Sequence, residues 1–150
     1  MTIGEVCNRE VVIMGRSESV LEAARQMREQ HVGDVVIVEE RLGARVPVGI
    51  LSDRDLVIEV LAKEVPVAAV AVGDIMSDRL LIAHENDEIQ ETVRRMRERG
   101  VRRIPVVSAT GSLVGILALD DLVELIAEQL TDLIALMRTE LRRERATRTS

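Results

Sequence analysis

Ser52 and Asp55 are the residues whose types and spacing could do chemistry. They lie in GILSDRDLV, residues 49–57, just after an apolar segment and just before a helical apolar pattern. A serine followed three residues later by an acidic residue is typical of a capping box, in which both side chains accept backbone N–H groups of a helix start. The same carboxylate, at the opening of a helix, can instead accept two hydrogen bonds from the vicinal hydroxyls of a ribose. The residues themselves leave both interpretations open.

The same phrase occurs twice in the chain. GILALDDLV, residues 115–123, begins 66 positions after the first copy, so Asp121 is the counterpart of Asp55. The counterpart of Ser52 is Ala118. An alanine at a helix N-cap costs about 1 kcal/mol of stability. The two phrases are therefore alike in backbone pattern but unequal in chemistry.

The repetition extends over most of the chain. An offset of 69 pairs Gly4 with Gly73 and Met27 with Met96, and the offset becomes 66 within EERLGAR, residues 39–45. Insertions are tolerated in surface hairpin loops, so we expect the two copies to differ in a loop at this place. Internal repetition of this kind predicts a duplicated supersecondary unit.

Each copy predicts the same order of elements. A short apolar strand (VVIM or LLIA) precedes an amphipathic helix, and two β-branched strands joined by a turn then lead to a second helix. The apolar stripe of the first helix is predicted at Val20, Ala24 and Met27 in one copy and at Ile89, Val93 and Met96 in the other. One such unit leaves a sheet face bare. We therefore predict a mixed α/β (α+β) fold of two pseudo-symmetric β-α-β-β-α repeats packed through their sheets.

The connector between the copies is EVPVAAVAVG, residues 64–73, which carries no charge after Glu64. A solvated linker is polar, so we expect this segment to pack against the protein as an added strand and to hold both copies as one rigid body. The first repeat is placed at residues 1–68 and the second at residues 69–126.

Residues 127–150 are predicted to form an extended C-terminal helix and a polar tail. Apolar residues continue at helical spacing as far as Leu141, and the chain becomes basic and polar in ELRRERATRTS, residues 140–150. We expect the last residues to be disordered. Two interpretations of the long helix are open, because its apolar stripe can cap its own subunit or can be buried against a second copy.

Composition excludes several classes of function. The net charge of −6 and the absence of Phe, Tyr and Trp argue against nucleic-acid binding. No apolar run approaches the ~20 residues of a membrane span and the N-terminus lacks a secretory signal, so a cytoplasmic location is expected. Cys7 is the only cysteine, which leaves no thiolate metal site within one chain. No nucleophile and base have a recognisable spacing, so we expect no enzyme activity.

These features resemble a known family. The order of elements, the phrase from Gly49 to Asp55 and the segment VRRIPVV at residues 101–107 are together similar to a pair of cystathionine β-synthase (CBS) domains, the Bateman module. The resemblance spans about residues 1–126 and is nearest in kind to stand-alone bacterial CBS-pair proteins. It implies a regulatory module that binds an adenosyl ligand (AMP, ADP, ATP or S-adenosylmethionine) in clefts between the repeats, and it implies a homodimer.

The resemblance also implies roles for particular residues. Ser52 and Asp55 match the ribose-binding positions of a first cleft, and Asp121 matches the corresponding aspartate of a second. Arg102 and Arg103 occupy the place where family members carry basic residues that meet ligand phosphates. No catalytic cofactor and no metal are implied, since the adenosyl compound would act as a regulatory ligand.

The two clefts are expected to differ in charge. Asp34 stands in the first copy where the second copy has its arginines. If each cleft takes its ribose and phosphate contacts from one repeat, the acidic side chain of Asp34 would lie where a ligand phosphate binds in the Ser52 cleft. A carboxylate about 4 Å from a ligand phosphate weakens binding by a few kcal/mol at an effective dielectric near 20. The loss of one hydrogen bond from a hydroxyl weakens binding by only roughly 1 kcal/mol. We therefore expect phosphate-bearing nucleotides in the cleft of Asp121, Arg102 and Arg103, and an empty cleft or an uncharged or cationic adenosyl group in the other.

Two functions follow from the sequence. The first is an adenosyl-ligand sensor that acts through the shape of a homodimer or through a partner protein. The second is a constitutive interaction or stress-associated CBS protein that keeps the fold but binds no nucleotide. A ligand-induced rise in thermal stability distinguishes them.

Overall fold

The computed structural model describes residues 1–77 and 79–149. The first copy and the segment before it form α1 (Ile3–Val6), β1 (Ile13–Met14), α2 (Val20–Gln30), β2 (Asp34–Arg41), β3 (Ala44–Ser52), α3 (Asp53–Leu56) and the π-helical turn η1 (Val57–Leu61). The second copy forms α4 (Val72–Ile75), β4 (Ala83–His84), α5 (Ile89–Arg99), β5 (Arg103–Val107), β6 (Leu113–Ala118) and α6 (Leu119–Thr149). The predicted strand-helix-strand-strand-helix order is confirmed in both copies, with one short helix added before each.

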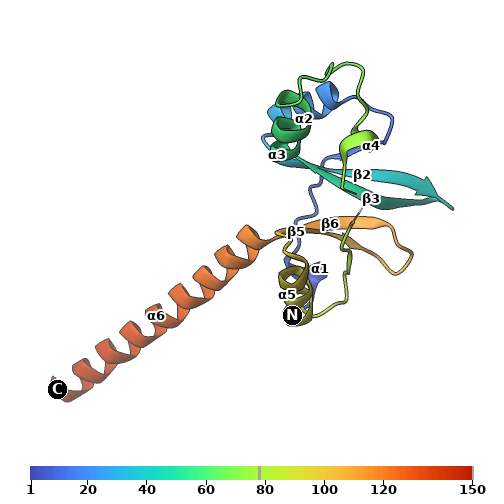
Figure 1. The fold of residues 1–150 in the computed structure, drawn as a ribbon. Coiled ribbons are helices and arrows are strands. Elements are labelled where there is room, and N and C mark those ends of the chain that lie inside the picture. The colour runs from blue at the N-terminus through green and yellow to red at the C-terminus, as the bar shows by residue number, and fades with distance from the viewer. Residues whose placement is uncertain (78, 150) are drawn as a thin grey trace. The chain divides into compact units, whose positions relative to one another are not determined.

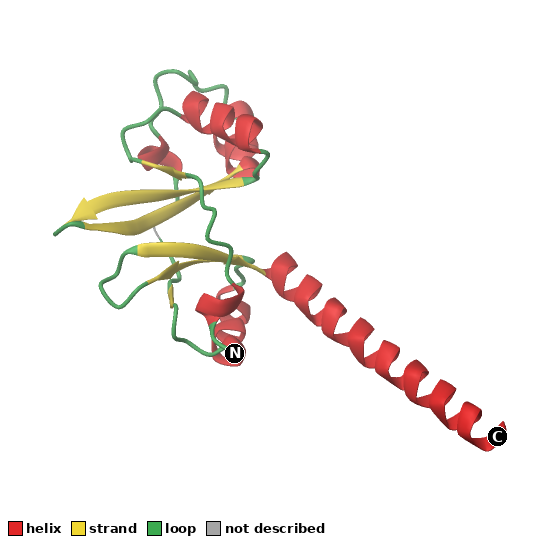
Figure 2. Ribbon diagram, turned by 180° about the vertical axis from the view of Figure 1, so that it is seen from behind, coloured by secondary structure: helices red, strands yellow, loops and turns green. Residues whose placement is uncertain are grey.

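Two three-stranded sheets lie within the compact unit Met1–Leu117, in the orders β1-β2-β3 and β4-β5-β6. In each sheet the short first strand runs parallel to the second strand. The sheets face each other, with α2 and α3 on the outer side of the first and α1 and α5 on the outer side of the second (Figures 1 and 2). The predicted packing of two repeats through their sheets is therefore confirmed.

The segment that precedes each repeat packs on the other repeat. The N–H groups of Ile3 and Gly4 donate to the carbonyls of Asp87 and Glu85, at 2.9 and 2.8 Å. In the first repeat, Val72 N–H donates in the same way to Glu18 O at 2.8 Å. This exchange ties both copies into one unit. The connector packs on the core only in part, through Val65, Val70 and Val72, whereas residues 66–69 are exposed. The added strand was wrong, because the segment forms turns, α4 and isolated bridges instead of a strand.

The glycine of the repeated phrase makes this exchange possible. A Cβ on Gly115 would lie 2.7 Å from Cys7 Sγ and 2.8 Å from Asn8 O, and Asn8 and Ile116 are joined by two backbone hydrogen bonds of 2.8 and 2.9 Å. In the first repeat, a Cβ on Gly49 would meet the Met76 side chain. Close approach of another chain segment is a common reason for glycine in a strand. Both glycines are thus covered by the protein's own exchanged segments.

The first helix of each repeat is rotated slightly from its predicted orientation. In α2 the fully buried neighbour of Val20 is Ala23, whereas Ala24 is exposed. In α5 the buried position is Thr92, and Val93 is 37% exposed. The predicted stripe was therefore wrong by one residue at its middle position in both helices. Thr92 is accommodated in the core because its Oγ1 donates to the carbonyl of Glu88 at 2.9 Å within the same helix.

The hairpin of the first copy is three residues longer than that of the second, and the difference lies in the lengths of the strands. β2 and β3 are joined by a two-residue turn, Leu42 and Gly43, which have positive φ values of 50° and 79°. The turn between β5 and β6 is longer, and those strands are shorter. The first copy thus extends its hairpin instead of lengthening its loop. Positive φ at both turn residues is the backbone geometry of a tight two-residue hairpin turn.

The helix α6 spans Leu119–Thr149 and forms a second unit with the residue before it, 118–150. Its 31 residues correspond to a length of about 46 Å. The extended C-terminal helix is confirmed, whereas the expected disorder of the last residues was wrong for the described part of the tail, because the helix continues to Thr149. Within residues 1–77 and 79–149, no helix is both long enough and apolar enough to cross a membrane.

Candidate functional site

A pocket of about 360 Å³ lies between the two repeats in the unit Met1–Leu117. This volume is within the range of about 300–1,000 Å³ found for small-molecule sites. Its polar lining residues are Asp34, Ser52, Asp55, Ser77, Arg79, Arg102 and Arg103. Its other lining residues are Ile50, Leu80, Leu81, Gly100 and Val101. The pocket therefore combines an apolar part with three arginines and two carboxylates.

Ser52 and Asp55 are placed by the junction of β3 with α3. Ser52 is the N-cap of α3, and its Oγ accepts the Asp55 N–H at 3.1 Å. Asp55 Oδ2 in turn accepts the Ser52 N–H at 2.9 Å, which completes the capping box. Both side chains are half-buried and both line the pocket. The capping interpretation is therefore confirmed, and it does not remove these residues from the pocket.

The second carboxylate oxygen of Asp55, Oδ1, is not used by the capping box and can accept further hydrogen bonds. A carboxylate has about four acceptor positions on its two oxygens. Among residues 1–77 and 79–149, no hydrogen bond reaches Asp55 Oδ1. The cap thus holds the side chain of this pocket-lining residue through Oδ2 and leaves the acceptor capacity of Oδ1 unused.

Asp34 and Arg103 form an ion pair across the two repeats. Asp34 Oδ2 accepts from Arg103 Nε, and the side chains are 15% and 40% exposed. Asp34 begins β2 directly opposite Ser52 in the antiparallel register, which brings it to the same end of the sheet. Burial raises the pKa of the Asp34 carboxyl, while the Arg103 guanidinium acts in the opposite direction and the charge of Asp53 adds to the rise. A ligand phosphate would have to compete with this carboxylate for Arg103.

The composition of the pocket corrects the expected division into clefts. Ser52 and Asp55 come from the first repeat, and Arg102 and Arg103 come from the second, yet all four line one pocket. The lining of this pocket therefore comes from both repeats and not from one repeat, while the ribose and phosphate roles of these residues stay predictions. Asp121 lies in the first turn of α6, outside the unit that forms the pocket.

Among the described lining residues, Arg79 is the charged one that was not predicted from the sequence. It follows α4 in the exchanged segment, together with Ser77, whose backbone is bridged to Ile50 of β3. The repeat offset of 69 pairs Arg79 with Glu10, so the difference in charge between these two positions was the available signal. Knowledge of the exchange was needed to connect Arg79 with Ser52.

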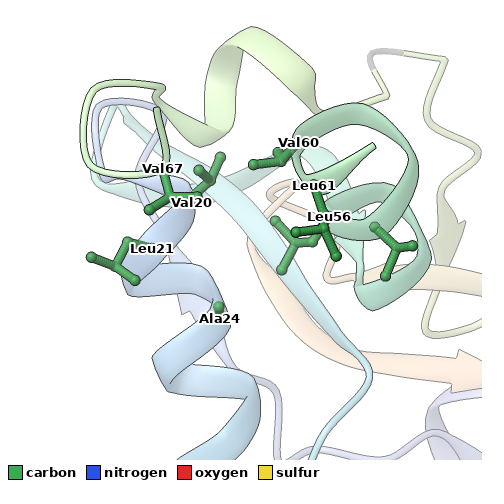
Figure 3. Close-up of a pocket in the computed structure, with 8 residues that line it drawn as sticks. Val20, Leu21, Ala24, Leu56, Val60, Leu61 and Val67 are labelled. Carbon is green, nitrogen blue, oxygen red and sulfur yellow. The ribbon is translucent and has the colours of Figure 1, made fainter. Parts of the chain in front are cut away.

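A second and smaller pocket of about 180 Å³ lies between α2 and the α3–η1 segment (Figure 3). It is lined only by aliphatic side chains, namely Val20, Leu21, Ala24, Leu56, Val57, Val60, Leu61 and Val67. Figure 3 shows the α2 side chains facing Leu56, Val60 and Leu61 across it. It offers no side-chain hydrogen-bonding group, so it is suited to an apolar contact and not to a nucleotide.

In the part of the chain that the structure describes, no three His, Cys, Asp or Glu side chains gather in a way that could hold a metal ion.

A duplicated β-α-β-β-α fold with a pocket between its copies defines this chain as a tandem-repeat module. The family model described as "CBS domain" matches residues 3–62 and again residues 72–128. The chain belongs to the CBS domain family, and it carries two CBS domains in tandem.

Two relatives match more than four fifths of the chain. The chain is 37% identical over 124 residues to an uncharacterized protein of Methanopyrus kandleri, covering 83% of this chain and 62% of that relative's length. It is 34% identical over 123 residues to hypoxic response protein 1 of Mycobacterium tuberculosis, covering 81% of this chain and 82% of the relative.

Solved structures agree with this fold. The crystal structure of hypoxic response protein I, which holds two coordinated zinc ions, has a TM-score of 0.72 and 31% identity, over 83% of this chain and 98% of that chain. The CBS domain pair of protein MJ0100, in complex with 5′-methylthioadenosine and S-adenosyl-L-methionine, has a TM-score of 0.74 and 21% identity, over 86% and 98% of the two chains. At that identity the second likeness supports the fold alone.

Proposed function

We propose that this chain is a non-catalytic regulatory module that binds an adenosyl ligand (AMP, ADP, ATP or S-adenosylmethionine) in the pocket between its repeats. The observation that carries the proposal is the meeting of Asp55 with Arg79, Arg102 and Arg103 around one volume of about 360 Å³. A diol acceptor and a cluster of guanidinium groups are the two chemistries that a nucleotide requires at once.

The sugar would be held at the start of α3. Asp55 Oδ1 accepts a ribose hydroxyl, while its Oδ2 remains bonded to the Ser52 N–H at 2.9 Å. The Ser52 hydroxyl can donate a further hydrogen bond, since its oxygen already accepts from the Asp55 N–H. Both side chains keep their positions on binding because the capping box holds them before the ligand arrives.

The phosphate would be held by arginines of the second repeat and of the exchanged segment. Guanidinium groups bind phosphate oxygens in a bidentate manner and are always charged. Among the lining residues that the structure describes, Arg79, Arg102 and Arg103 contribute three positive charges, and Asp34 and Asp55 contribute two negative charges. This modest excess favours a ligand with few phosphate groups.

The adenine would lie against the aliphatic part of the lining. Ile50, Leu80, Leu81 and Val101 provide that surface. The sequence has no Phe, Tyr or Trp, so the base would be held by aliphatic packing and by main-chain groups instead of stacking on such rings.

The regulatory output would be delivered by a homodimer or to a partner protein. Val57, Leu61 and Val67 line the aliphatic pocket of Figure 3 and are 54%, 71% and 43% exposed. An exposed apolar surface of this kind supports a protein contact. The alternative function, a constitutive interaction or stress-associated protein, would use such a surface without any nucleotide.

A thermal-shift titration tests the proposal. AMP, ADP, ATP and S-adenosylmethionine are each added to the full chain, and the unfolding midpoint is followed by circular dichroism because the chain has no Trp or Tyr. A ligand at about 100 times its dissociation constant adds ~2.7 kcal/mol, which corresponds to a rise of roughly 5–11 °C. An unchanged midpoint with all four compounds at millimolar concentration would favour the constitutive alternative.

Replacing Asp34 with asparagine is expected to tighten AMP binding by about tenfold at neutral pH. The substitution removes a negative charge from the phosphate end of the pocket and releases Arg103 from its ion pair. The expected increase is measured by calorimetry with AMP. The control is Asp53→Asn, which removes a nearby charge that does not line the pocket and should have a smaller effect.

The effect of Asp34 should depend on pH in a defined direction. Its pKa is raised in the folded protein, so the carboxyl takes up a proton at a higher pH than an ordinary aspartate. As the pH falls through that raised pKa, wild-type affinity should approach that of Asp34→Asn, and the difference should vanish below the ordinary aspartate value. Protonation of free AMP is the same in both experiments and cancels in the ratio of the two dissociation constants, so this ratio reports on the charge of Asp34. A ratio that stays constant across the acidic range would contradict this role.

A further inference from the structure

The helix α6 carries an apolar seam with coiled-coil spacing. Val123, Ile126, Leu130, Leu133 and Met137 follow one another at intervals of three, four, three and four residues. Each of these side chains is 57–62% exposed. A 3-4 alternation of apolar residues is the pattern of a helix that packs along its length against another helix.

The seam is flanked by more apolar residues than a solvated helix carries. Ile134, Leu136 and Leu141 lie beside it and are 41%, 63% and 52% exposed. Contiguous apolar surface of this extent marks a contact with another protein surface. Together with the seam, these residues form an apolar stripe that is wide enough to be buried against another helix.

The charges of α6 are segregated along its length. The N-terminal half, up to residue 134, has five acidic residues and no basic residue: Asp120, Asp121, Glu124, Glu128 and Asp132. The C-terminal half has five arginines and two glutamates: Arg138, Arg142, Arg143, Arg145, Arg148, Glu140 and Glu144. The halves thus have net charges of −5 and +3. A parallel pair of such helices would place like charges together, whereas an antiparallel pair places acidic halves beside basic halves.

We propose that α6 pairs in antiparallel orientation with α6 of a second copy of this chain. The spacing of the seam and the segregated charges together select the register, in which Leu130 packs against the partner subunit's Leu133 and Ile126 packs against the partner subunit's Met137. The helix dipoles also oppose each other favourably in this arrangement. The inference rests on the homodimer proposed above and not on the adenosyl pocket.

Disulfide cross-linking in the full chain tests both the contact and its direction. With Cys7 replaced by serine, one protein carries Ile126→Cys and a second protein carries Met137→Cys. The two are mixed and oxidised. In antiparallel pairing, residue 126 of one copy faces residue 137 of the other, so the covalent dimer should be mainly the mixed species. Two tags of different mass on the chains identify that species by electrophoresis or mass spectrometry.

Matched substitutions then test the seam. Leu130→Glu with Leu133→Glu should reduce the mixed disulfide at least about tenfold, because two charges enter the apolar contact. Thr131→Glu with Thr139→Glu adds the same charge at positions off the seam and should leave the yield nearly unchanged. Circular dichroism establishes that both variants keep the helix.

Several outcomes would overturn the inference. Disulfides formed mainly between identical chains would indicate parallel pairing, and the absence of any covalent dimer would exclude contact through α6. Equal yields in the two glutamate variants would remove the seam from the contact. A dimer that persists in sedimentation without α6 cross-linking would leave the homodimer intact but assign it to another surface, and nucleotide titration is unaffected by any of these results.

Discussion

We expect Asp55→Asn to lower the affinity for AMP by about 10- to 100-fold, whereas Asp121→Asn leaves it within about twofold of wild type. Asparagine lacks the negative charge that strengthens hydrogen bonds to the ribose hydroxyls, and bonds to a charged group contribute about 1.5–3 kcal/mol. The asymmetry follows from the pocket, in which Asp55 shares its volume with Arg102 and Arg103. By the offset of the repeat, the positions equivalent to these arginines are Gly33 and Asp34.

The Asp55→Asn substitution is chosen because it should weaken ligand binding without unfolding the start of α3. Its side-chain carbonyl can still accept the Ser52 N–H, so the capping box of α3 is largely retained. Calorimetry gives the dissociation constant for AMP, and thermal unfolding without ligand reports any loss of the cap. A loss of affinity in Asp121→Asn with none in Asp55→Asn would contradict the pocket assignment. It would restore the division of residues expected from the sequence.

Gly115→Ala is expected to destabilise the protein by about 1–3 kcal/mol, which lowers the unfolding midpoint by about 2–12 °C. The added Cβ would lie 2.8 Å from the carbonyl oxygen of Asn8 and 2.7 Å from Cys7 Sγ. Asn8 is held there by two hydrogen bonds with Ile116, so the exchanged segment cannot move away without breaking them. Thermal and urea unfolding measure the change.

Gly15→Ala provides the matched control. A Cβ at Gly15 would meet only Glu18 Oε2, at 3.9 Å, which is an ordinary contact. Its backbone does not require the left-handed region, so alanine should leave the midpoint unchanged or raise it slightly. If Gly115→Ala proved as stable as Gly15→Ala, the N-terminal segment would not be held against β6 as the structure has it.

Local periodicity accounts for the part of the fold that could be predicted. The order of strands and helices follows from apolar alternation and helical spacing, which act over a few residues and recur in both copies. The capping box at Ser52 and Asp55 is likewise a local arrangement, and the structure has it as expected. The stripe of α2 was missed by one residue because Ala23 and Ala24 fit helical spacing almost equally well. Packing against the sheet decides between them.

The sequence by itself determined the duplication and the order of the elements. It also identified Ser52, Asp55, Arg102 and Arg103 as candidate ligand-binding residues. Only the tertiary structure decided which of them share a pocket. The physical reason is the exchange of segments before each repeat, whose hydrogen bonds join residues as distant as Asn8 and Ile116. Such contacts have no counterpart in local spacing. Tertiary packing therefore brought Arg79 to Ser52 and set Asp34 against Arg103.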